Sequence, residues 1–189
     1  MELELKHLAG YLPYGVKVAY LRRAIGSSEI LEIIPSQQID AIYTQYNGVE
    51  IHTEPYSKRA FLIDYKLQLH PLSSLTKEIE VDGRSFIPII ELARLENGGG
   101  IFDYQIEKLF ILDFGGSIGL YYTSSAGLVE FSYDPEFMTF TMMLRHKDES
   151  YKCDLTVNHQ LKMFQKLFEW HFDVFGLIGK GLAINMEEL

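Results

Sequence analysis

The sequence lacks the features of an exported or membrane-embedded protein. It has one cysteine, Cys153, which excludes a disulfide within the chain, whereas small secreted domains usually carry several. No segment offers the ~18 consecutive apolar residues of a membrane span, and the N-terminus lacks the basic segment and apolar run of a secretory signal. We therefore expect a protein of the reducing cytoplasm with no membrane association.

Positive charge is also scarce. Lysine and arginine total 17 against 26 acidic residues, so the net charge is −9. This balance disfavours direct binding to DNA or RNA, because such binding depends on cations that neutralise phosphates. Residues 101–140 hold six acidic residues and one basic residue, which form either a solvated face or an acidic surface for a basic partner. In the second interpretation, the binding residues are Asp113, Glu130, Asp134 and Glu136.

No feature of the sequence marks a boundary between domains. The six prolines are scattered, and no repeat or low-complexity run separates one part of the chain from another. Apolar residues make up 47% of the chain, as is typical of globular proteins, and 189 residues suit one hydrophobic core. We predict a single domain, residues 1–189.

Alternating apolar and polar residues predict antiparallel hairpins in the first half of the chain. Strands are expected at residues 16–21, 28–34 and 60–69. In the stretch IYTQYNGVEIHT (42–53), Asn47-Gly48 supplies the positive-φ pair of a type I′ turn. That turn would pair residue 46 with 49 and residue 44 with 51. It separates an apolar face (Ile42, Thr44, Tyr46, Val49, Ile51, Thr53) from a polar one (Tyr43, Gln45, Glu50, His52, Glu54).

The middle of the chain repeats this pattern. Asp82-Gly83 predicts a second hairpin, and Pro88 begins a short helix that the NGGG of 97–100 ends. Residues 108–145 then contain four aromatic-rich strands that are separated by turns with glycine or proline, which is typical of an antiparallel meander.

The last element has a helical period. Phe164, Phe168 and Phe175 recur at steps of four and seven residues in a stretch that Asn158 can cap and Gly176 can end. We expect the sheet to cover this apolar stripe at least in part, with room for a homodimer contact through Trp170, Phe172 or Phe175. The predicted fold is therefore α+β: antiparallel β-hairpins and a meander packed by a C-terminal amphipathic helix.

One motif suggests an enzyme. Residues 115–119 fit G-x-S-x-G, the turn that exposes the serine of a hydrolase, with Ser117 as the nucleophile and acids and histidines later in the chain. The residues that follow have a β-type pattern, whereas such a turn enters a helix. We therefore prefer a glycine-rich hairpin loop and keep the serine hydrolase as an alternative.

The six histidines do not have the spacing of a metal site. His52, between Glu50 and Glu54 on the polar face of its hairpin, could help to bind a divalent cation, but a solvated cluster of charges is the simpler interpretation. The sequence predicts neither a metal nor a cofactor, and binding of a small ligand between sheet and helix stays open.

Three segments resemble a known group of proteins: LKHLAGYLPYGVKV (5–18), HPLSSLTKEI (70–79) and LFEWHFDVFGLIGKGLAI (167–184). They are similar to short uncharacterised proteins encoded by phages and mobile elements of gut Bacteroidales. The resemblance implies a bacterial host cell and supplies no functional residue. We expect a small acidic interaction protein, not an enzyme, that binds or modulates a host or phage protein.

Overall fold

The computed structural model describes residues 3–24, 27–45, 48–54, 58–96, 105–112, 116–147 and 152–189. It divides the chain into two compact units, unit 1 (Met1–Pro71 and Leu167–Leu189) and unit 2 (Leu72–Lys166). Both contain antiparallel sheets, and a helix lies in the C-terminal part of the chain, so the predicted α+β class is confirmed. The single domain expected from the length stays a prediction.

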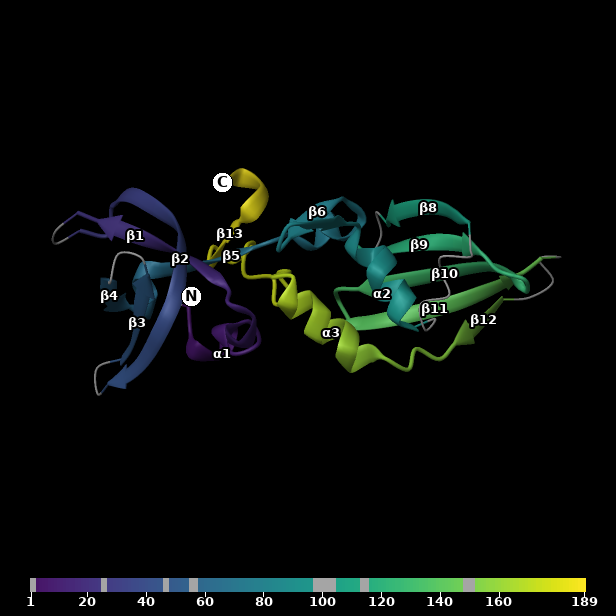
Figure 1. The fold of residues 1–189 in the computed structure, drawn as a ribbon, viewed down its shortest axis with the longest axis horizontal. Coiled ribbons are helices and arrows are strands. Elements are labelled where there is room, and N and C mark those ends of the chain that lie inside the picture. The colour runs from purple at the N-terminus through teal and green to yellow at the C-terminus, as the bar shows by residue number, and fades with distance from the viewer. Residues whose placement is uncertain are drawn as a thin grey trace. The chain divides into compact units, whose positions relative to one another are not determined.

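Unit 1 is built on a six-stranded sheet with the order β13-β5-β1-β2-β3-β4 (Figure 1). Its strands are β1 (Lys17–Arg23), β2 (Ile30–Gln45), β3 (Gly48–Glu54), β4 (Lys58–Phe61), β5 (Tyr65–Leu69) and β13 (Ala183–Asn185). All pairs are antiparallel except β13 with β5. Short helical segments accompany the sheet: α1 (Leu5–Leu8), η1 (Leu12–Tyr14), η2 (Leu62–Asp64) and η5 (Met186–Glu188). The core of this unit includes Leu8, Tyr11, Val18, Ile51, Leu67 and Leu177.

The hairpin between β2 and β3 differs from the predicted register by two residues. Ile42 pairs with Ile51 and Thr44 with Val49, so the two-residue connection is 46–47 and not Asn47-Gly48. Residues 46 and 47 lie outside the described part of the chain. Because side chains alternate with a period of two, a shift of two residues keeps the apolar and polar faces as predicted.

Unit 2 is a five-stranded antiparallel meander with the order β12-β11-β10-β9-β8 (Figure 1). Its strands are β8 (Ile106–Ile111), β9 (Ile118–Thr123), β10 (Gly127–Asp134), β11 (Thr139–His146) and β12 (Lys152–Leu155). The hairpin of β6 (Ile79–Val81) and β7 (Arg84–Phe86) turns at Asp82-Gly83, both with positive φ as predicted. The helical segments are η3 (Leu72–Thr76), α2 (Pro88–Glu96) and α3 (Gln160–Glu169), and the boundary between the units falls within α3.

One face of the meander forms the core of unit 2. Val129, Phe131 and Tyr133 of β10 lie on this face, paired with residues 144, 142 and 140 of β11. The ring of Phe164, from α3, lies 6.1 Å from that of Tyr133. The predicted covering of the sheet by an aromatic helix is therefore confirmed for the part of α3 that belongs to unit 2.

The helix ends earlier than predicted. α3 stops at Glu169, and His171 adopts the left-handed conformation with φ 56°. The N–H of His171 bonds the carbonyl of Phe168, and the N–H of Phe172 bonds that of Leu167. These two bonds make a Schellman motif, so a histidine ends the helix where Gly176 was expected to do so. Histidine is among the residues that enter the left-handed region more often than most.

Candidate functional site

The turn between β10 and β11 exposes apolar side chains at the surface of unit 2. Asp134 Oδ1 accepts the backbone N–H groups of Glu136 (2.9 Å) and Phe137 (3.1 Å), which fixes the first half of the turn. Met138 closes it with φ 48°, a conformation that side chains other than glycine rarely adopt. Hydrogen bonds between residues that are close in the sequence therefore fix the backbone of this turn.

The turn exposes apolar side chains. Phe137 is 72% exposed, the highest value for an aromatic residue in the described part of the chain, and Met138 is 42% exposed. Gln160, the first residue of α3, lies beside the turn because its side chain accepts the N–H of Phe140 (3.0 Å). The next residue of α3, Leu161, is 73% exposed. We call Glu136, Phe137 and Met138 the turn surface.

The acidic residues predicted to bind a partner fall into three groups. Asp134 and Glu136 belong to the turn, where Asp134 holds the backbone and Glu136 is exposed. Glu130 lies on the same face of β10 as Asp134, four residues earlier, and takes part in a hydrogen bond with Tyr121. Burial, with Glu130 adding to it, raises the pKa of Tyr121. Asp113 lies outside the described residues.

Ser117 does not form the strand–turn–helix arrangement of a hydrolase serine. It is followed directly by β9, and its hydroxyl lies 3.5 Å from Asp134 Oδ2. No histidine stands between the hydroxyl and this carboxylate. His146 pairs with Gly127, at the opposite end of β10 from Asp134. Ser117 therefore contacts the side chain that fixes the β10–β11 turn.

The aromatic residues predicted for a homodimer contact are largely buried. Trp170 is 8% exposed and Phe172 is fully buried, and the carbonyl of Phe172 accepts the Tyr11 hydroxyl at 2.8 Å. Phe175 is partly buried, with its ring 5.7 Å from that of Phe168. The aromatic stripe is therefore covered by the protein itself over most of its area.

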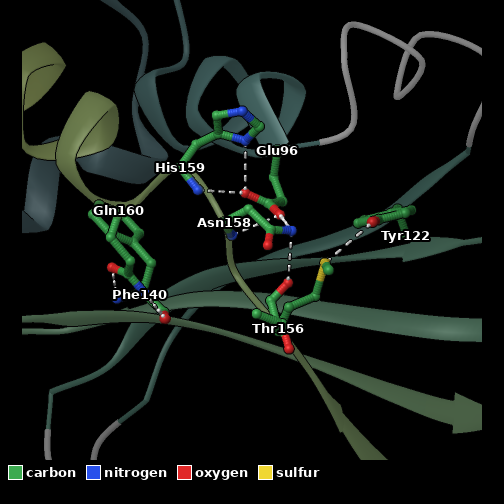
Figure 2. Close-up of polar contacts among 8 residues, drawn as sticks. Glu96, Tyr122, Phe140, Thr156, Asn158, His159 and Gln160 are labelled. Atoms are coloured by element: carbon green, nitrogen blue, oxygen red, sulfur yellow. Dashed lines mark hydrogen bonds and ion pairs between the residues drawn. The ribbon is translucent and has the colours of Figure 1, made fainter.

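A second polar cluster in unit 2 joins the end of α2 to the beginning of α3 (Figure 2). Oε1 of Glu96 accepts the backbone N–H (2.9 Å) and the side-chain amide (3.0 Å) of Asn158. Oε2 of Glu96 accepts the backbone N–H (3.1 Å) and Nδ1 (3.2 Å) of His159. Asn158 was predicted to accept N–H groups at the start of α3, but the side chain that accepts them there is the carboxylate of Glu96.

The electrostatics of this cluster favour an ionised glutamate. Burial raises the pKa of Glu96, but the hydrogen bonds from Asn158 and His159 outweigh it and hold the pKa below the usual value. A carboxylate near the first N–H groups of a helix also interacts favourably with the helix dipole. The Glu96–His159 pair has the geometry in which a carboxylate orients an imidazole, and here it connects two helices of unit 2.

Unit 1 contains a buried polar network that the sequence did not predict. The N–H of His70 bonds the carbonyl of His171 (2.8 Å), and the N–H of Asp173 bonds the carbonyl of His70 (2.9 Å). His171 Nε2 donates to the carbonyl of Tyr14 (3.0 Å), and the Tyr11 hydroxyl accepts the N–H of Val174. The segments 5–18, 70–79 and 167–184 therefore meet in this network.

Burial shifts the ionisation of the network. It lowers the pKa of His70, with nearby His171 adding to the effect, and it raises the pKa of Asp173. Asp173 nevertheless accepts the backbone N–H groups of Leu177 (2.6 Å) and Ile178 (2.8 Å). Burial disfavours the charged forms of both His70 and Asp173. We therefore interpret the network as a structural one that holds these three segments together.

Comparison with family models, with curated proteins and with solved structures found no match to this chain. In the described part of the chain, no helix has both the length and the apolar character that crossing a membrane requires.

Sequence reasoning found Glu136 of the turn surface and Asp134, which fixes the turn, but it missed Phe137 and Met138, and it missed the exposure of Leu161. The signal for Phe137 is local: Asp134-Pro135 begins a turn, and the third residue of a short turn points away from both strands. The exposure of Leu161 has no such signal, because it depends on how α3 lies on the sheet.

Proposed function

We propose that this chain is a non-enzymatic interaction protein that binds a partner protein through the turn surface, in the cytoplasm of a bacterial host of phages or mobile elements. The observation that carries the proposal is the exposure of Phe137, 72%, on a turn whose backbone is fixed by Asp134. A large aromatic side chain on a pre-organised turn loses little conformational entropy when it binds.

The chemistry of the turn surface suggests what the partner offers. Interfaces tend to have an aromatic anchor at the centre and polar residues at the rim. Phe137 with Met138 would fill an apolar pocket, and Glu136 would face a basic rim. Burying a phenylalanine side chain that is exposed in the free protein contributes roughly 2–3 kcal/mol to binding.

The hydrolase alternative has no support from the geometry of Ser117. Its hydroxyl touches Asp134 directly, and β9 follows it in place of a helix. An activated serine requires a base within hydrogen-bond reach that can take its proton. We therefore do not propose an enzymatic role for Ser117.

The test is site-specific photocrosslinking in bacterial cells. A photoreactive phenylalanine analogue replaces Phe137, and the control carries it at Leu31, which is 56% exposed but belongs to unit 1. A discrete, nuclease-resistant adduct at position 137 that is absent at position 31 supports the proposal. If cells that carry the phage or mobile element give no adduct at position 137, the proposal is wrong. An adduct with a second copy of this chain would mean that the protein binds itself through this surface.

Charge reversal separates the aromatic part of the surface from the acidic part. Glu136→Lys should weaken the captured complex at least several-fold, since it places a cation against a basic rim. Glu80→Lys makes the same change at an exposed position of β6 and serves as the control. Binding that is unchanged by Glu136→Lys would reject the contribution of the acidic residues.

A further inference from the structure

Unit 1 carries a cluster of potential metal ligands on β2 and β3. One ligand atom each from Asp40, His52 and Glu54 lies within 4.8 Å of the others. His52 Nδ1 and Asp40 Oδ2 are 3.1 Å apart. Asp40 and Glu54 are exposed and His52 is partly buried, so a small cation would reach all three donors from solvent.

A β-bulge brings Asp40 into this cluster. Ile39 pairs with Thr53 and Ala41 with His52, so Asp40 is an extra residue on β2 with no partner of its own on β3. In a regular ladder, residue 40 would pair with Thr53, whose side chain is fully buried, and would point to the other face of the sheet. The bulge instead turns the Asp40 carboxylate toward His52, as bulges next to functional sites often do.

We propose that Asp40, His52 and Glu54 form a binding site for a divalent first-row transition metal, with Zn²⁺ as the probe. One imidazole and two carboxylates are a donor set that zinc accepts, and water completes the four-coordinate shell. Bond lengths of 2.0–2.2 Å imply that neighbouring ligands of a tetrahedral zinc lie about 3.3–3.6 Å apart. The 3.1 Å separation of the Asp40 and His52 donors is close to that spacing.

The charges of the cluster give a second reason to expect a metal ion there. The cluster places two carboxylates close together on a chain with a net charge of −9. Like charges at this range disfavour each other, and a dication between them reverses the sign of the interaction. The site lies in unit 1 and is independent of the turn surface of unit 2.

The experiment is titration calorimetry of the full-length, tag-free chain with zinc chloride at neutral pH. The wild type should bind one zinc per chain, and Asp40→Asn, His52→Gln and Glu54→Gln should each raise the dissociation constant at least tenfold. Glu50→Gln is the matched control, because Glu50 also flanks His52 on β3 but is not part of the cluster. It should leave the dissociation constant within about twofold of the wild-type value.

A spectroscopic measurement on the unmodified chain guards against variants that misfold. Cobalt added to wild-type protein should shift the ring protons of His52 before those of the other five histidines. The proposal is overturned if the wild type takes up no zinc, or if another histidine responds first. It is also overturned if Glu50→Gln weakens binding as much as Glu54→Gln, since that result means diffuse attraction to acidic residues.

Discussion

Replacing Glu96 by glutamine should destabilise unit 2 strongly at neutral pH. The carboxylate of Glu96 accepts four hydrogen bonds, two at each oxygen, from Asn158 and His159. A glutamine can accept at only one of its two terminal atoms. Turned toward Asn158, its NH₂ group meets two donors. Turned toward His159, it meets the backbone N–H and a ring nitrogen that accepts only in one neutral tautomer of the imidazole.

The size of the effect follows from the one or two hydrogen bonds that are lost. Hydrogen bonds to a charged group contribute about 1.5–3 kcal/mol each, and part of this is recovered when the freed donors reach water. We expect Glu96→Gln to lower the free energy of unfolding by roughly 2–4 kcal/mol. For a chain of this length, that corresponds to a fall in melting temperature of roughly 4–16 °C.

The difference between wild type and variant should depend on pH. The hydrogen bonds hold the pKa of Glu96 below its usual value of 4.5 in the folded protein, despite burial, which raises it. A group with a depressed pKa stabilises the folded state above its unfolded pKa, and this contribution is lost as the pH falls through the folded pKa. The stability difference should therefore be full at pH 7 and shrink below about pH 4.

The assay is urea unfolding followed by far-UV circular dichroism at neutral and acidic pH. Glu80→Gln, at an exposed position of β6, is the control for removal of a negative charge. If Glu96→Gln costs less than about 0.5 kcal/mol, the size that exposed substitutions usually have, the capping role of Glu96 is refuted. A cost that is the same at both pH values would refute the electrostatic part of the argument.

Three further predictions concern other positions. Gly119→Ala should cost about 3 kcal/mol in urea unfolding, because the new Cβ would overlap the carbonyl oxygen of Phe131. A loss below about 1 kcal/mol would contradict the close packing of the strands. His171→Ala should destabilise the protein by about 1 kcal/mol more than His171→Gly does. Both variants lose the imidazole, but only glycine adopts the left-handed conformation of residue 171 without strain. Equal losses of stability would contradict this explanation. Burial raises the pKa of Asp173 in the folded protein, so folding favours its protonated form. The free energy of unfolding of wild type relative to Asp173→Asn should therefore increase as the pH falls from 7 toward the pKa of the unfolded chain. A decrease over this pH range would contradict the prediction.

The sole tryptophan allows a simple check that the aromatic stripe is buried. Because Trp170 is 8% exposed, its emission should lie to the blue of that of free tryptophan, and iodide should quench it weakly. A red-shifted, strongly quenched signal in the native chain would contradict the burial of the aromatic stripe.

Several elements could be predicted from the sequence because their causes are local. Asp82-Gly83 turns the β6–β7 hairpin, and Pro88 begins α2 as expected. Four of the five strands of the meander follow from period-two alternation, and the aromatic stripe of α3 follows from its helical period. In each case the residues that specify the structure are neighbours in the chain, so their pattern can be read directly.

Only the tertiary structure decided the features that depend on distant residues. The β2–β3 register moved by two residues and gained a bulge at Asp40, both compatible with the same alternation of faces. Glu96 caps α3 from a position 62 residues before Asn158, and α3 ends at a histidine whose ring bonds the carbonyl of Tyr14. These features depend on contacts between segments far apart in the sequence, and local periodicity carries no information about such contacts. The sequence therefore determined the kinds of elements, whereas packing determined where they end, how they pair and which side chains meet.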